Sequence, residues 1–254
     1  MNGRAWRPSQ GEAATPPVPR RVLDGLRASA EAGEAAWLLD ALRDFDFTVG
    51  SIVPPVFDSY VRVFHPAGRA SGDDEVDVRW AEVAAANGRV MHPAAEWGSL
   101  VGSWHLGYRN YPTELFSSEP ETGQLPAAVA RRLVAVLSEH TARSDEACFG
   151  VWEGWGRGST MFFVSRDTSE EARRRTEAAD RARREAWYGL LDGAAKFNVP
   201  GRGMHLLRGP LAAIEDFYEF HRNPPSIWWP ADRTWCVATG IDLMTTYVGG
   251  TRAA

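Results

Sequence analysis

The sequence predicts a single α+β domain in which helices flank a mainly antiparallel sheet. Large and small side chains alternate along residues 235–241, and a period of two is typical of a β-strand. Apolar residues recur every four positions along residues 125–141, which predicts an amphipathic helix. Several strand-like runs are joined by short turns, without a strict βαβ rhythm, and this order favours an antiparallel sheet.

The composition is that of an ordinary globular protein: 44% of the 254 residues are hydrophobic and 24% are charged. A formal net charge of -5 argues against attraction to nucleic acid or to anionic lipid. No run approaches the ~18 apolar residues of a membrane span, and no apolar signal-peptide core is present. We therefore expect a cytoplasmic protein with no membrane or nucleic-acid partner.

Residues 1–19 are polar and rich in Pro, Gly and Ala, so they predict a disordered tail before a domain spanning residues 20–254. Strands are expected at 45–53 and 59–64, followed by a polar loop at 68–75. Residues 80–86 predict a short helix that ends at Asn87-Gly88.

The clearest helix is residues 125–141, where Pro126 occupies the first turn and lacks only an N–H that would be unpaired anyway. Strands are expected next at 148–155 and 160–164, joined by a glycine-rich bend. A strand at 204–208 and a helix at 210–220 follow.

Residues 168–197 predict a helical insertion of a different character. Acidic and basic side chains pair at i, i+4 along residues 168–184, and no apolar stripe appears before Trp187. We interpret this as a solvated helix. Nucleic-acid binding by the arginine run 173–175 is the alternative, and the neighbouring acids weaken it because they cancel the charge.

The end of the chain predicts a turn at residues 225–234, held by Pro230 and Asp232, and then the strands 235–241 and 243–248. In the first strand, Trp235 and Val237 face one way while Cys236 and Ala238 face the other. We expect Trp235 to be buried in the core.

The stretch WWPADRTWCVATGID at residues 228–242, with TYVGG at 246–250, resembles a motif of uncharacterised actinobacterial proteins. The segments YVRVFHP (60–66), FGVWEGWG (149–156) and HLLRGPL (205–211) belong to the same resemblance. It implies no activity. It does imply that further residues follow Gly250, so we expect a truncated C-terminus.

Candidate chemistry is sparse. The six histidines form no HxH, HxxxH or HExxH pair, so the sequence predicts no metal site and no cofactor. Cys148 and Cys236 are interpreted as buried free thiols. A thiol nucleophile is the alternative, because Cys236 would meet His205 if their strands paired.

Tryptophan is unusually frequent, with 11 in 254 residues. Buried rings are the simplest interpretation, and an aromatic surface that binds a ligand or protein is the other. Trp155 and Trp229 flank bends, where rings more often reach the surface. The candidate binding residues are these two and their neighbours: Glu153, Trp155, Trp228, Trp229, Asp232, Arg233 and Asp242.

We interpret the chain as a non-enzymatic protein that binds a protein partner or a small ligand through this aromatic-rich surface, resembling bacterial immunity or regulatory proteins at the level of fold only. One alternative is a hydrolase that uses Glu153 or Asp242 with a histidine. The other is a carbohydrate-binding module. The sequence leaves the ligand and the oligomeric state open.

Overall fold

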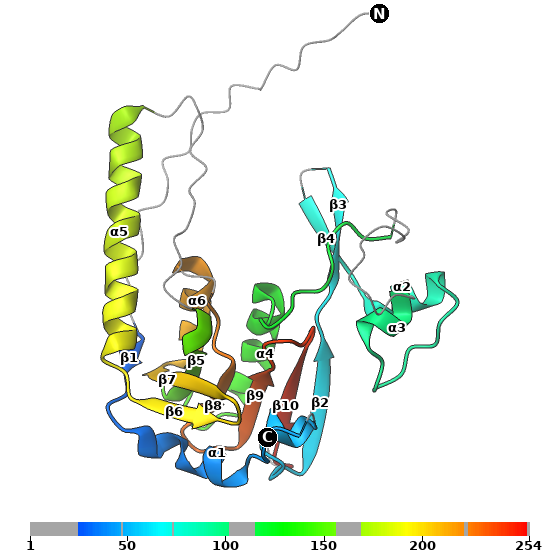
Figure 1. Ribbon diagram of the computed structural model, residues 1–254, viewed down its shortest axis with the longest axis horizontal. Coiled ribbons are helices and arrows are strands. Elements are labelled where there is room, and N and C mark those ends of the chain that lie inside the picture. Colours follow the sequence, from blue (N-terminus) through cyan, green and yellow to red (C-terminus); the bar gives the residue numbers. More distant parts are fainter. Residues whose placement is uncertain are drawn as a thin grey trace, which may run out of the picture.

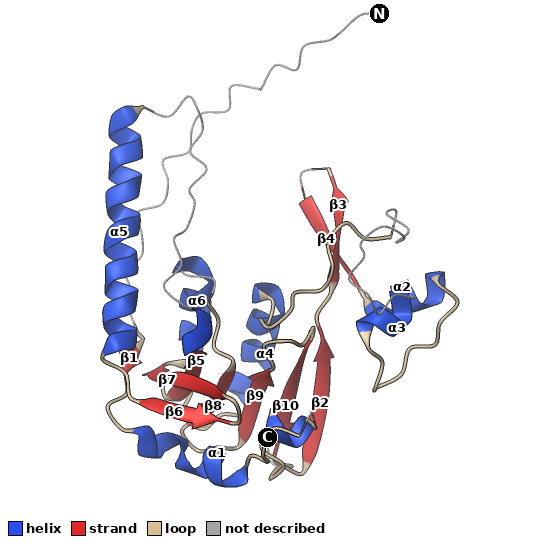
Figure 2. Ribbon diagram, in the orientation of Figure 1, coloured by secondary structure: helices blue, strands red, loops and turns tan. Residues whose placement is uncertain are grey.

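The computed structural model describes residues 25–46, 48–72, 74–101, 115–155, 169–220 and 223–252. The predicted tail at 1–19 and the predicted strand at 160–164 lie outside the described residues. Helices and an antiparallel sheet together form an α+β architecture, as the sequence predicts (Figures 1 and 2).

The main sheet is built in the order β1-β7-β5-β8-β9-β10-β2, and β6 pairs with β7 on the same edge as β1. Every neighbouring pair is antiparallel. Its strands are β1 (Arg27–Ala28), β2 (Ser59–Phe64), β5 (Ala147–Trp152), β6 (Lys196–Val199), β7 (Arg202–Gly209), β8 (Ile227–Pro230), β9 (Trp235–Thr239) and β10 (Thr245–Gly250).

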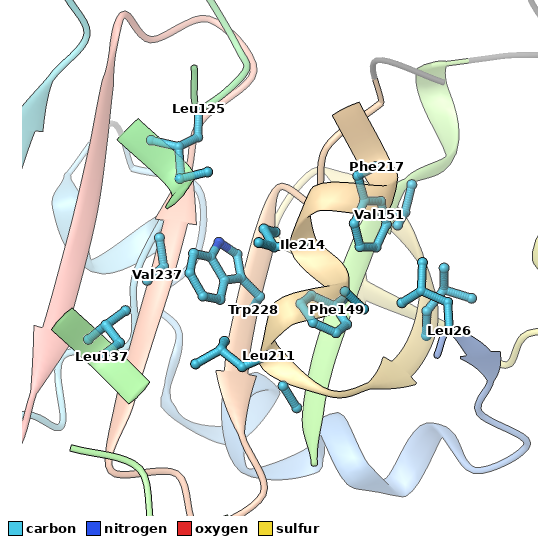
Figure 3. Close-up of a cluster of buried hydrophobic side chains, with 14 of the residues drawn as sticks. Leu26, Leu125, Leu137, Phe149, Val151, Leu211, Ile214, Phe217, Trp228 and Val237 are labelled. Atoms are coloured by element: carbon cyan, nitrogen blue, oxygen red, sulfur yellow. The ribbon is translucent and has the colours of Figure 1, made fainter. Parts of the chain in front are cut away.

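One face of this sheet carries a row of apolar residues that lie opposite one another across four strands. Phe149 pairs with Trp228, Trp228 with Val237, and Val237 with Val248. Directly opposed residues point to the same face. Helices α4 (Ala127–Glu139) and α6 (Ile214–Phe220) cover this face, and Figure 3 shows Trp228 between Val237 and Ile214. The helix predicted at 125–141 is confirmed.

The opposite face carries the alternate residues of the same strands. Cys148 pairs with Trp229, and Cys236 lies on this face with Ala238. The N-terminal helix α1 (Ala36–Ala41) packs there through Leu38, which has no exposed surface. The predicted alternation of residues 235–238 is therefore confirmed, and the sheet is buried on both faces.

A second, smaller apolar cluster lies beyond β2. It contains the hairpin β3 (Ala67–Ser71) and β4 (Asp74–Val78) with the helices α2 (Trp80–Ala86) and α3 (Trp97–Val101). Its core is a chain of rings, Phe64, Trp80, Trp97 and Phe116, with successive centroids 4.7, 5.3 and 5.2 Å apart. The prediction of a loop at 68–75 is wrong, because these residues form a hairpin whose turn is at Gly72.

The long helix α5 (Glu170–Asp192) runs through the range where the charge pairs predict a helix. Its residues 170–179 are all exposed, and the helix extends upward from the β1 and β6 edge of the sheet (Figure 1). Only its C-terminal part joins the core, through the buried ring of Trp187.

Two further expectations are wrong, and one strand is missing from the prediction. Residues 45–53 contain a 3-10 helix (Val49–Ser51) rather than a strand. Residues 227–230 form the central strand β8 rather than part of a turn, because Pro230 ends the strand opposite Ala147 and only the residues after it turn. Strand β6 was not expected, since Lys196 and Asn198 are exposed and the apolar alternation covers only four residues.

Candidate functional site

Trp228 and Trp229 belong to the core and not to a binding surface. Each is 1% exposed, and the two rings lie on opposite faces of β8. Trp228 packs against Trp235 with a centroid distance of 5.3 Å, whereas Trp229 packs against Trp37 at 5.9 Å. Their inclusion among the surface residues is wrong because β8 lies in the middle of a sheet that is covered on both sides.

Asp232 and Arg233 form the turn between β8 and β9. The Asp232 carboxylate accepts hydrogen bonds from the Thr234 amide at 3.1 Å and from its hydroxyl at 2.8 Å. Arg233 has a φ of 60° and its guanidinium lies 5.7 Å from the centroid of Trp37. The Asp232 side chain therefore holds the turn and the Arg233 side chain packs on Trp37, at the end of β8 that faces Ala147, the first residue of β5.

Glu153 and Trp155 lie together in a cleft at the other end of β5, with a volume of about 230 Å³. The strand ends at Trp152, and the 3-10 helix Glu153–Trp155 bends the chain over the start of β7. Gly203 leaves room for the Glu153 carboxylate, which would have to shift if residue 203 carried a Cβ atom. The cleft is lined by Val151, Trp152, Glu153, Trp155, Tyr188, Leu191, Asp192, Lys196, His205 and Asn223.

The sheet register explains why these residues meet. Lys196 of β6 lies opposite His205 of β7, and His205 lies opposite Val151 of β5. These side chains share one face of the sheet, and the C-terminal turn of α5 closes the cleft above them. The rings of Trp152 and Trp155 meet edge to face, with centroids 5.4 Å apart.

A hydrogen bond and burial determine the protonation states of Glu153 and His205. Lys196 Nζ donates a hydrogen bond to Glu153 Oε2 at 3.0 Å, and this bond lowers the pKa of the Glu153 carboxyl. Burial lowers the pKa of His205, and the nearby Lys196 ammonium lowers it further. Near neutral pH the Glu153 carboxyl is therefore ionised and the His205 imidazole is neutral.

Two buried nitrogen atoms of the cleft, Trp155 Nε1 and His205 Nδ1, have no hydrogen-bond partner among the residues that the structure describes. An unpaired buried polar atom costs about 1–3 kcal/mol. The indole nitrogen can only donate, whereas a ring nitrogen of neutral histidine donates or accepts according to its tautomer. A ligand that paired with these atoms would recover part of that cost.

Asp242 lies outside this cleft, in a second cavity of about 300 Å³ between the β6–β7 turn and the β9–β10 turn. Arg202 lines the same cavity. Burial lowers the pKa of its guanidinium, and the negative charge of Asp242 partly opposes this effect. The other lining residues are Phe45, Ser51, Ile52, Pro200, Gly201, Gly240, Ile241 and Leu243.

The thiol chemistry considered for Cys236 is wrong. Strands β5 and β8 separate β9 from β7, so Cys236 does not meet His205. Burial raises the pKa of the Cys236 thiol, and burial with the Glu34 carboxylate raises that of Cys148 to about 12. Both cysteines are buried free thiols, as expected.

Among the cavity residues that the sequence did not predict as binding residues, Trp152, Lys196, Arg202 and His205 bear most on the chemistry. Lys196 carried a signal, since it is the one lysine in a chain rich in arginine. The other three lie on β5 and β7, and the local pattern does not show how these strands pair. Where the chain is described, no group of three or more His, Cys, Asp or Glu side chains is placed to hold a metal ion.

The chain matches no protein-family model, no curated protein and no solved structure in the comparisons made with known proteins. Within the described residues, no helix has the length and apolar character needed to cross a membrane.

Proposed function

We propose that the protein binds a small polar ligand in the cleft at the end of β5. One observation carries the proposal: beside a cavity of about 230 Å³, Trp155 Nε1 and His205 Nδ1 are buried and find no partner within the described part of the chain. Ligand sites typically combine apolar and aromatic walls with a few convergent polar groups. This cleft has that composition.

The side chains favour a ring-containing ligand with hydrogen-bonding groups. Trp152, Trp155 and Tyr188 supply the aromatic walls. Lys196 is 60% exposed and Glu153 is 43% exposed, so this ion pair lies at the solvent side, where it would contact a polar substituent. The volume of about 230 Å³ lies below the lower limit of about 300 Å³ for typical ligand pockets, which favours a small ligand.

The electrostatics favour binding over catalysis. The hydrogen bond from Lys196 keeps Glu153 ionised, so this carboxylate is a poor general acid at neutral pH. The raised pKa values of both thiols disfavour a cysteine nucleophile. These observations support a binding protein.

Lys196 makes the proposal directly testable. Reductive methylation with ¹³C-formaldehyde labels its amine, and the chain contains no other lysine, so the only other labelled group is the terminal amine. We would titrate the labelled protein with a library of small polar ring compounds that includes monosaccharides and aromatic amides. A ligand of the cleft should shift the Lys196 methyl resonance.

Trp155→Ala tests whether such a shift reports the cleft. We expect it to weaken binding about tenfold or more, the equivalent of one lost hydrogen bond with its ring contact. Val136→Ala is the matched control, since Val136 is 56% exposed on α4 and does not line the cleft. Ligands that bind Trp155→Ala and the wild type equally, or a library that never shifts Lys196, would contradict the proposal.

A hydrolase is the second candidate because Glu153 and His205 line the same cleft, close enough for the Glu153 carboxylate to raise the pKa of the imidazole against the effect of burial. In that case Glu153→Gln should abolish turnover of a chromogenic ester or glycoside without changing ligand affinity. A binding protein should show no turnover, and Glu153→Gln should change only the affinity.

A further inference from the structure

We infer that the second cavity is a binding site for an α-amino acid with an apolar side chain. The cavity of about 300 Å³ lies between the 3-10 helix Val49–Ser51 and the two turns that contain Pro200 and Asp242. Its position on different elements from the cleft makes this a separate site.

The state of Arg202 carries the inference. The guanidinium is partly buried, and no hydrogen bond or ion pair joins it to any residue that the structure describes. Arginine side chains that lose water normally gain a planar anion in exchange, because the guanidinium presents a rigid fork of donors. A carboxylate matches this fork with two parallel hydrogen bonds, as a phosphate also does, and it is the anion that an α-amino acid carries beside its ammonium group.

Asp242 supplies the complementary charge. It lines the same cavity and is exposed, and its charge acts on Arg202 without forming an ion pair with it. The two opposite charges are thus displayed separately to the cavity. A ligand that carries a carboxylate and an ammonium group satisfies both, whereas a simple anion would be repelled by Asp242.

The remaining wall is apolar and selects the side chain of the ligand. Ile52 and Leu243 are half-buried, Phe45 is 53% exposed, and Pro200 adds its ring. An aliphatic or aromatic side chain would cover these surfaces, which favours leucine or phenylalanine over a polar amino acid.

Calorimetric titration with L-leucine and L-phenylalanine tests the site. We expect Arg202→Gln to weaken binding about tenfold or more, the effect of losing a charge-assisted hydrogen bond. Asp242→Asn should weaken the binding of leucine but not the binding of 4-methylpentanoate, which lacks the ammonium group. Glu153→Gln is the matched control and should leave the affinity unchanged, so this result is independent of the cleft.

A second measurement guards against an unfolded variant. Without ligand, Arg202→Gln should melt at or above the wild-type temperature, because it removes a partly buried charge that has no partner. Leucine should raise the melting temperature of the wild type alone. The inference is overturned if isopentylamine binds as tightly as leucine, if Arg202→Gln binds normally, or if no amino acid binds at about 10 mM, a concentration that would detect a very weak site.

Discussion

At the scale of single residues, burial separates two kinds of tryptophan. Trp235 has no exposed surface, and its Nε1 donates to Thr141 Oγ1 at 2.9 Å. Trp155 is half-buried, and no described residue accepts a hydrogen bond from its Nε1. The first ring is fully satisfied inside the core, whereas the second retains both surface and a donor for a ligand.

Replacing Trp235 by alanine should therefore destabilise the fold by about 3–5 kcal/mol, the usual cost of removing a large buried ring. Trp155→Ala should cost about 1 kcal/mol or less, because much of its surface is already in contact with water. Denaturant unfolding of the two variants measures the difference. If Trp235→Ala unfolds like the wild type while Trp155→Ala does not, the assignment of core and cleft is inverted.

At the scale of elements, the single helix α5 has two segments, one exposed to solvent and one packed on the core. Arg174 and Arg175 pair with Glu170 and Glu171 in its first turns, where all four side chains are at least 75% exposed. Such exposed pairs stabilise a helix by only about 0.3–0.5 kcal/mol each. Further along, Trp187 is 1% exposed and packs edge to face on Phe217. The C-terminal part alone is anchored.

We expect that residues 170–179 can be replaced by a Gly/Ser linker with little loss of stability, because none of them is buried. The melting temperature should stay within about 4 °C, the shift that ~1 kcal/mol produces in a domain of this size. Asp180 marks the boundary of the replacement, since it is buried beside Arg183. The matched control is Trp187→Ala, which should lower the melting temperature much further. A collapse of folding in the linker variant would show that the exposed part packs on the domain.

At the scale of the whole molecule, His65 joins the main sheet to the smaller cluster. Its Nδ1 donates to the carbonyl of Glu121 at 2.6 Å, which leaves Nε2 to accept from Thr246 Oγ1 at 2.9 Å. Its own carbonyl accepts from Trp80 Nε1 at 2.7 Å. The side chain has no exposed surface, and burial lowers its pKa from 6.5 to about 4. The neutral ring is thus part of the native structure.

This shift predicts a loss of stability in mild acid. Between pH 6.5 and 4, His65 is protonated in the unfolded chain but stays neutral in the native structure. The free energy of unfolding therefore falls as the pH is lowered. The full contribution, present above the unfolded value of 6.5, is on the order of 3 kcal/mol.

Chemical denaturation at several pH values measures this effect. Carboxyl groups also titrate in this range, so the informative quantity is the difference between the wild type and His65→Gln, which keeps a hydrogen-bonding side chain but does not titrate. The variant should lose less stability on acidification. Equal pH slopes would show that His65 does not control this junction.

Local sequence determined those features that depend on neighbours along the chain. The alternation from Trp235 to Ala238 requires opposite faces in any strand. The helix α2 ends where Gly88 adopts a φ of 62°, which glycine allows without steric cost. The general α+β class follows from the same local patterns.

Tertiary structure alone decided which strands are central and which residues meet. Trp229 directly precedes Pro230, and the sequence therefore predicts an exposed ring at a bend. The ring is buried because β8 lies between β5 and β9. Glu153 and Lys196 are 43 positions apart and form an ion pair because β5 and β6 both pair with β7. Strand order depends on the combined burial of all the apolar faces, so no local pattern contains it, and the two cavities exist only once that order is set.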